Sequence, residues 1–167
     1  MRFKGMALIA GVAVLAACGG GDASTEAPAV TPTAAPESAP AGGAMASGAA
    51  MPITGKTIEV KMIGDAKGFR YEPATITANV GDGIKFIMES GGPHNVAFDA
   101  ATIPAAGKAQ LDANFGSDRI GELSSGLKMA PGESFTLSLG GVAPGTYPFV
   151  CTPHLAMNMK GTLTIQP

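Results

Sequence analysis

Near its end the chain reads Gly145-Thr-Tyr-Pro-Phe-Val-Cys151-Thr-Pro-His154-Leu-Ala-Met157-Asn-Met159-Lys-Gly161-Thr-Leu-Thr-Ile165. Leu163 and Ile165 alternate with threonines, which is typical of a strand that has one face on a core. We therefore predict a hairpin in which one strand ends at Cys151 and the next begins at Thr162. The loop between them carries a thiol, an imidazole and two thioethers.

Three earlier segments show the same period of two. Residues 58–62, 84–88 and 135–139 each alternate large apolar side chains with polar ones. Turn-forming residues separate the segments, namely Gly81-Asp-Gly83, Pro131-Gly132 and Pro144-Gly145. Several short strands at such intervals predict an all-β sandwich, and we expect about seven to eight strands.

Residues 100–130 lack this alternation. They contain scattered small and charged side chains, and residues 110–115 are compatible with a helical turn. We predict a long, partly helical excursion between two strands.

The N-terminus has the features of an export signal. Arg2 and Lys4 precede an apolar run over residues 6–15, which is too short to cross a bilayer of about 30 Å as a helix. The run ends in Leu15-Ala16-Ala17-Cys18-Gly19, which resembles the lipobox of bacterial lipoproteins. We predict a signal peptide over residues 1–17 and a lipid on Cys18 that holds the protein to a bacterial membrane, facing the periplasm or the cell exterior. The alternative is an ordinary secretory signal, which also predicts export.

The composition divides the remaining chain in two. Residues 18–52 are Ala, Pro, Gly, Ser and Thr with almost no large apolar side chain, so we expect a disordered tether there. Residues 53–167 form the folded domain, which we expect to be a monomer. The chain has 11 basic and 13 acidic residues, and this balance argues against nucleic-acid binding, which needs clustered positive charge.

The scarce residues suggest a metal site. The chain has two histidines and two cysteines, and with Cys18 assigned to the lipid only Cys151 remains for the domain. His94 precedes a short apolar run, and a sandwich brings loops at one end together, so His94 can meet the loop of Cys151 and His154. Two imidazoles, a thiolate and a weak axial thioether are the donors of a blue copper site. Spacing alone leaves the thioether open between Met157 and Met159.

Three motifs resemble the cupredoxin family, and most closely its plastocyanin and pseudoazurin branches. They are Pro93-His94-Asn95-Val96, Cys151-Thr-Pro153-His154 and Met159-Lys-Gly161. The resemblance implies a Greek-key β-sandwich that binds one copper ion. It implies that His94, Cys151, His154 and Met159 are the ligands, because only Met159 is followed by one residue and then a glycine, as the family's axial methionine is. Met157 remains the alternative axial ligand.

The resemblance also implies roles for neighbouring residues. Asn95 would tie the two ligand loops together and donate its backbone amide to the cysteine sulfur, and Pro153 would shape the ligand loop. Electrons would pass through His154, near which a redox donor and acceptor would dock. Val150 stands where plant plastocyanins commonly have tyrosine, and no acidic run follows Phe98, so docking through an acidic face is not expected.

The expected function is one-electron transfer outside the cytoplasm, by cycling between Cu(II) and Cu(I). The alternative is a periplasmic copper-binding protein or chaperone that uses the same ligands. We expect no catalysis, because both histidines are already used and further copper centres would need more of them.

Overall fold

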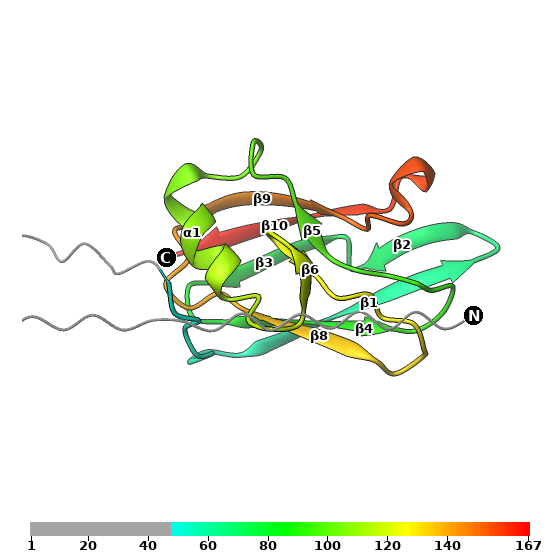
Figure 1. Cartoon of the computed structure of the whole chain (residues 1–167), viewed down its shortest axis with the longest axis horizontal. Helices are drawn as coiled ribbons and strands as arrows, with labels where there is room; N and C mark the ends of the chain where they lie inside the picture. The colour runs from blue at the N-terminus through cyan, green and yellow to red at the C-terminus, as the bar shows by residue number, and fades with distance from the viewer. Residues whose placement is uncertain (1–47) are drawn as a thin grey trace, which may run out of the picture. The chain divides into compact units, whose positions relative to one another are not determined.

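The computed structural model describes residues 48–167 (Figure 1). The predicted signal peptide, Cys18 and most of the predicted tether lie outside the described residues. Among the residues that are described, no helix has both the length and the apolar character needed to span a membrane.

The domain is built from two sheets. The first has the strand order β2-β1-β4-β8, in which β1 runs antiparallel to β2 and parallel to β4, and β4 runs antiparallel to β8. Its strands are β1 (Thr57–Asp65), β2 (Gly68–Glu72), β4 (Gly83–Met88) and β8 (Ser134–Ser138).

The second sheet has the order β3-β10-β9-β5-β7-β6. In it β10 pairs in parallel with β3 and antiparallel with β9, so β9 and β10 form the hairpin that the sequence predicts. Its strands are β3 (Thr75–Asn79), β5 (Ala97–Phe98), β6 (Arg119–Gly121), β7 (Ser124–Ser125), β9 (Gly145–Val150) and β10 (Lys160–Gln166).

The core consists of the apolar side chains that alternate along the strands. Most apolar positions of β1, β4, β8 and β10 are buried, as their period of two predicts, and Ile58 at the start of β1 is partly buried. Aromatic rings from both sheets meet among them, with the centroids of Tyr71 and Phe149 4.8 Å apart and those of Phe86 and Phe149 5.6 Å apart. The predicted all-β, cupredoxin-like sandwich is therefore confirmed. The described residues form ten strands where seven to eight were expected, and two of the ten, β5 and β7, are only two residues long.

The excursion is helical over different residues from those expected. Helix α1 (Ala105–Ala113) begins five residues before the predicted turn at 110–115 and ends within it. The glycine in the middle of α1 fits the packing, because a Cβ on Gly107 would collide with the hydroxyl of Tyr147. In the last turn of the helix, Asp112 accepts hydrogen bonds from the guanidinium of Arg119 and from the backbone amide of Leu123. These bonds hold β6 and β7 against the helix.

The two ends of the sandwich carry different elements (Figure 1). The loop between β9 and β10 lies at one end, and α1 lies at the other. At the helix end, the backbone amide of Met51 donates to Asn114, and the side chain of Gln110 donates to the carbonyl of Ala49. Ala49 and Met51 belong to the last part of the predicted tether, so the chain enters the domain at the end remote from the β9–β10 loop.

Candidate metal centre

His94 lies between β4 and β5 and is fixed on two sides. Its backbone amide donates to the carbonyl of Lys128 at 3.0 Å, and the amide of Lys128 donates back at 2.7 Å. Its ring nitrogen Nε2 lies 2.8 Å from the carbonyl oxygen of Ser90. A carbonyl only accepts hydrogen bonds, so Nε2 carries the proton and Nδ1 keeps its lone pair for a metal.

The loop of Cys151 is closed by its own backbone. The amide of Cys151 donates to the carbonyl of Met159 at 3.0 Å, and the amides of His154 and Met159 bond within the same loop. A short 3-10 helix, η1 (Leu155–Met157), fills the turn, and Asn158 then takes a left-handed conformation with φ 62° that returns the chain to β10. Cys151, His154 and Met159 therefore have fixed positions relative to one another.

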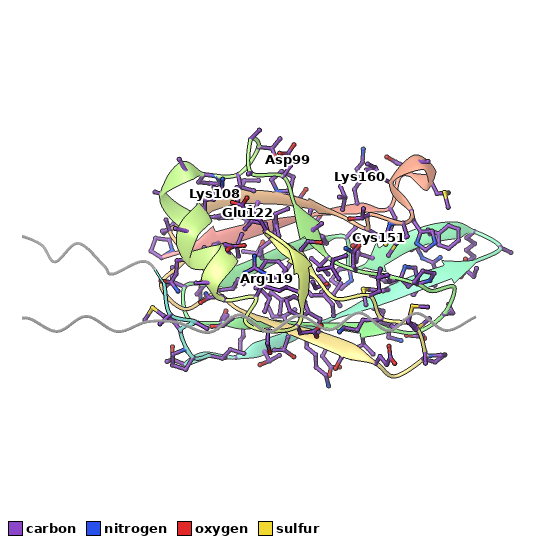
Figure 2. The ribbon with its side chains drawn as sticks, in the orientation of Figure 1. Asp99, Lys108, Arg119, Glu122, Cys151 and Lys160 are labelled. Carbon is purple, nitrogen blue, oxygen red and sulfur yellow. The ribbon has the colours of Figure 1, made fainter. Side chains whose placement is uncertain are left out.

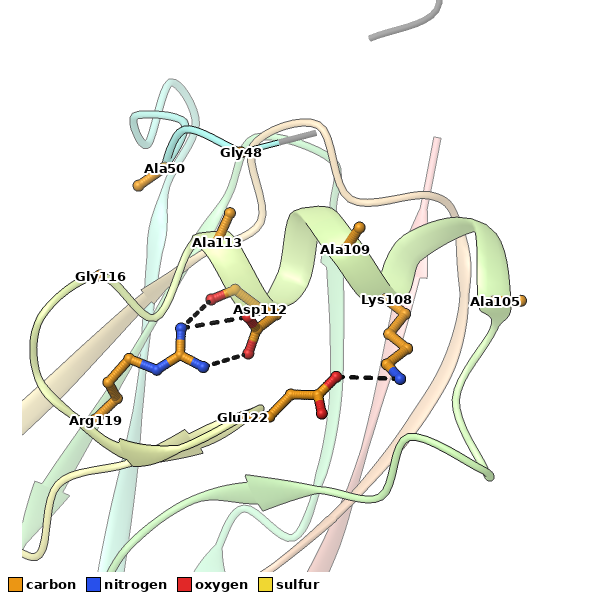
Figure 3. Close-up of a pocket in the computed structure, with 10 residues that line it drawn as sticks. All are labelled: Gly48, Ala50, Ala105, Lys108, Ala109, Asp112, Ala113, Gly116, Arg119 and Glu122. Carbon is orange, nitrogen blue, oxygen red and sulfur yellow. Dashed lines mark hydrogen bonds and ion pairs between the residues drawn. The ribbon is translucent and has the colours of Figure 1, made fainter. Parts of the chain in front are cut away.

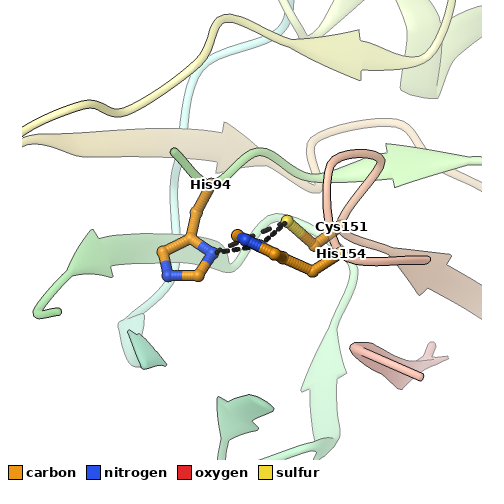
Figure 4. A group of neighbouring side chains, drawn as sticks. All are labelled: His94, Cys151 and His154. Carbon is orange, nitrogen blue, oxygen red and sulfur yellow. Dashed lines mark hydrogen bonds between the residues drawn. The ribbon is translucent and has the colours of Figure 1, made fainter. Parts of the chain in front are cut away.

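Three predicted ligands form a triangle of donor atoms (Figure 4). His94 Nδ1 lies 3.6 Å from Cys151 Sγ and 3.2 Å from His154 Nδ1, and Cys151 Sγ lies 3.4 Å from His154 Nδ1. A point in their plane equidistant from all three lies about 2.0 Å from each, close to the ~2.0–2.3 Å bonds that imidazole nitrogen and thiolate sulfur form with a metal such as zinc. The donor set and its size therefore fit copper.

The two candidate methionines differ in burial. Met159 is fully buried within the hydrophobic core, at 0% exposed, whereas Met157 is 48% exposed. An axial thioether belongs to a dry site, so burial favours Met159.

The same burial sets the protonation of the ligands. It lowers the pKa of His94 and of His154 below the usual value, so both imidazoles are neutral and able to bind metal at pH 7. Burial raises the pKa of the Cys151 thiol, although the backbone of Asn95 and of His154 and the hydroxyl of Tyr71 act in the opposite direction. A metal ion would displace the thiol proton on binding.

Asn95 is buried between the two ligand loops. Its Oδ1 accepts a hydrogen bond of 2.8 Å from the amide of Thr152, and its Nδ2 donates to the hydroxyls of Thr152 and Ser124. One side chain thus joins the His94 loop to the Cys151 loop and to β7. Pro153 is exposed in the turn between Cys151 and His154. A hydrogen bond of 3.2 Å from the amide of His154 to the carbonyl of Cys151 closes this turn.

Phe69 is a residue at the site that sequence reasoning missed. Its ring stacks on that of His154 with centroids 3.8 Å apart and planes 13° apart. Phe69 lies on β2, which was not predicted as a strand because its sequence, Gly-Phe-Arg-Tyr-Glu, is short and shows little apolar alternation. The aromatic residues Phe69 and Tyr71, two positions apart, were the sequence signal that could have predicted this strand.

A separate hollow lies beside α1, at the end of the domain opposite the donor triangle (Figures 2 and 3). Its volume is about 700 Å³. The charged groups that line it pair with each other, with Lys108 bonding to Glu122 at 3.1 Å and Arg119 to Asp112 at 2.6 Å. Among the described residues, the group of metal donors found is His94, Cys151 and His154, none of which lines this hollow.

The sandwich and its buried His-Cys-His triangle define a cupredoxin, a β protein that holds one copper ion between two loops. A model of the family described as copper binding proteins, plastocyanin/azurin family, matches residues 58–166. The chain therefore belongs to the plastocyanin/azurin family of copper-binding proteins, whose plastocyanins carry electrons with type 1 copper.

Individual relatives agree with this. The chain is 37% identical over 117 residues to plastocyanin from Prochlorothrix hollandica, covering 70% of this chain and 79% of the relative. It is 35% identical over 109 residues to plastocyanin from Rumex obtusifolius, covering 65% and 100%. The oxidized form of plastocyanin from Dryopteris crassirhizoma superposes with a TM-score of 0.50 at 33% identity, covering 65% of this chain and 100% of that one.

Proposed function

We propose that this chain is a one-electron carrier that holds a single type 1 copper ion through His94, Cys151, His154 and Met159. The observation that carries the proposal is the buried triangle of two imidazole nitrogens and one sulfur, with a buried methionine on the same loop. When bound, copper supplies the Cu(II)/Cu(I) couple, and soft sulfur together with imidazole donors suits both oxidation states.

The protein's own part is to keep the donors in place and dry. Asn95 joins the two loops, and the backbone bonds of the Cys151 loop fix three of the four ligands. A site that moves little between its two oxidation states exchanges electrons with little reorganisation. The apolar surroundings exclude water and so influence the reduction potential.

Burial of the ligands favours a carrier over a copper chaperone. His94 and Cys151 are fully buried, and His154 is nearly so. A chaperone must release its ion to an acceptor, which requires an accessible site. With four protein ligands, no coordination position is left for a substrate, so we propose no catalysis by this chain.

The surface near His154 is the proposed docking site for a redox donor and acceptor. Leu155 is 57% exposed and Met157 48% exposed, and they stand one and three positions after His154 in the loop. Exposed apolar side chains at an electron exit favour partners with an apolar surface. Nothing in this arrangement requires a second copy of the chain or a nucleic acid, and we propose a monomeric carrier.

We also propose that the protein is exported and held to a membrane by a lipid on Cys18. The lipobox-like sequence at residues 15–19 supports the lipid. Ala49 and Met51, which end the predicted tether, contact the domain at the helix end, away from the copper loops. A Cys18→Ser variant should move the protein from the membrane fraction to the soluble fraction, and an unchanged distribution would contradict the lipid.

Copper loading of the full chain tests the electron-transfer proposal. Titration with Cu(II) should give an intense thiolate-to-copper absorption band that saturates at one ion per chain, with a narrow copper hyperfine splitting in EPR. The band should disappear on reduction and return on reoxidation without loss of copper to a chelator. A Cys151→Ser control should be colourless. A colourless wild-type protein would overturn the proposal, and loss of copper at each reduction would favour the chaperone.

A further inference from the structure

Tyr71 places a hydroxyl group inside the core next to the metal loops. The residue lies on β2 and is only 2% exposed. Its hydroxyl donates a hydrogen bond of 2.6 Å to the backbone carbonyl of Asn95, 24 positions along the chain. Its ring meets that of Phe149 edge to face, with centroids 4.8 Å apart and planes at 70°. This packing leaves the hydroxyl little freedom to move.

Asn95 is the residue on which the joining of the two loops depends. Its side chain accepts from the amide of Thr152, directly after Cys151, and its backbone amide acts to lower the pKa of the Cys151 thiol. Tyr71 is therefore connected to the sulfur through a single intervening residue. The Tyr71 hydroxyl also acts to lower the pKa of the Cys151 thiol, against the larger effect of burial.

We propose that Tyr71 is a positioning residue of the copper site, whose hydroxyl holds Asn95 in place and so raises the reduction potential of the copper. The inference rests on the proposed function. A hydrogen bond to the cysteine sulfur draws electron density from it and stabilises the electron-rich Cu(I) state. Anything that fixes the donor amide of Asn95 against the sulfur therefore favours the reduced protein.

Removal of the Tyr71 hydroxyl would release the Asn95 backbone from its hydrogen bond. Phenylalanine keeps the ring and its packing but leaves the Asn95 carbonyl without its donor in a dry core. A buried polar group without a partner is unfavourable, so Asn95 would shift towards another donor. That movement takes the Asn95 backbone amide away from the sulfur.

The test compares the two tyrosines of the chain. Tyr147 is a matched control, because its hydroxyl also donates at 2.6 Å to a backbone carbonyl, that of Ala143, but close to α1 and not to the metal loops. Tyr71→Phe should lower the midpoint potential and shift the thiolate-to-copper band. The expected change is up to tenfold in the ratio of oxidised to reduced protein at a fixed solution potential, or up to about 59 mV for one electron. Tyr147→Phe should leave both unchanged. Equal effects of the two variants, or no effect of Tyr71→Phe, would overturn the inference.

Amide hydrogen exchange in the metal-free protein gives a readout that does not depend on copper. Tyr71→Phe should speed exchange at the Thr152 amide, which bonds to Asn95, and Tyr147→Phe should not; equal rates in both variants would overturn the positioning role. A wild-type protein that shows no blue band would instead contradict the proposed function, so the two failures are distinguishable.

A further measurement, which needs no substitution of Tyr71, covers the case in which Tyr71→Phe does not fold. In the Tyr147→Phe background Tyr71 is the remaining tyrosine, and growth on 3-fluorotyrosine makes its hydroxyl a stronger donor. The midpoint potential should then rise, and an unchanged potential would overturn the inference.

Discussion

Replacing Asn95 by alanine tests how strongly one side chain couples the two ligand loops. The substitution removes three hydrogen bonds: those with the Thr152 amide at 2.8 Å, the Thr152 hydroxyl at 3.3 Å and the Ser124 hydroxyl at 3.2 Å. A lost hydrogen bond is typically worth about 0.5–1.5 kcal/mol, and a donor left unpaired adds about 1–3 kcal/mol. The amide of Thr152 is the group left unpaired. We expect Asn95→Ala to lower the free energy of unfolding by roughly 2–4 kcal/mol.

Thermal unfolding of the metal-free protein, followed by circular dichroism, measures this loss. For a domain of this size a loss of about 3 kcal/mol corresponds to a fall of roughly 10–20 °C in the midpoint temperature. The copper-loaded variant should in addition bind Cu(II) more weakly and show a shifted thiolate-to-copper band, because Thr152 directly follows the ligand Cys151.

Asn114 provides the control at the other end of the domain. It is also buried, and its side chain donates to the carbonyls of Ser138 and Gly140 at 2.9 Å each and accepts from the amide of Met51. Asn114→Ala should be destabilising to a similar extent but leave the copper spectrum unchanged. The reasoning is refuted if Asn95→Ala unfolds within about 0.5 kcal/mol of the wild type, the range of ordinary surface substitutions, or if both variants alter the spectrum equally.

Three further predictions follow from burial and stacking. Met159→Leu should shift the copper spectrum and potential while Met157→Leu, at an exposed position, should leave them nearly unchanged; the reverse result would identify Met157 as the axial ligand. Phe69→Leu keeps apolar cover but removes the stack on His154, so urea unfolding of the metal-free protein should show a loss of about 0.5–1.5 kcal/mol, and no loss would mean that the stack is neutral. Burial raises the pKa of both tyrosines above the usual 10.0, so their contribution to stability is complete below pH 10 and decreases as the pH rises further. Tyrosinate absorbance of the native protein should therefore appear at a higher pH than that of the unfolded protein, and titration near pH 10 in the folded state would contradict this.

The main strands were predictable because each carries its own signal. Residues 58–62, 84–88 and 135–139 alternate apolar and polar side chains, and most of their apolar positions are buried in the sandwich. The parts that were missed lack such a signal. Strand β7 consists of two serines that pair with β5 and β6, and the start of α1 depends on how Gly107 packs against Tyr147. Local periodicity cannot report contacts of that kind.

The candidate site also has a part that the sequence could predict and a part that it could not. Cys151 and His154 are three positions apart on one tight loop, so their proximity was implied by the chain itself. His94 reaches them through the packing of two sheets, and its Nδ1 faces them because Ser90 occupies its other ring nitrogen. The sequence could suggest that His94 joins the site, whereas its ring orientation depended on a backbone carbonyl that no motif records.

By itself, the sequence determined the class of fold and the set of donor side chains, because alternation and ligand spacing are properties of short segments. Only the tertiary structure decided which methionine is buried, since the left-handed turn at Asn158 and the packing of the loop on the core bury Met159 and expose Met157. It likewise decided that Phe69 and Tyr71 reach the site. Both lie on β2 and contact His154 and Asn95 across long sequence separations, and such contacts exist only once the two sheets have closed over a common core.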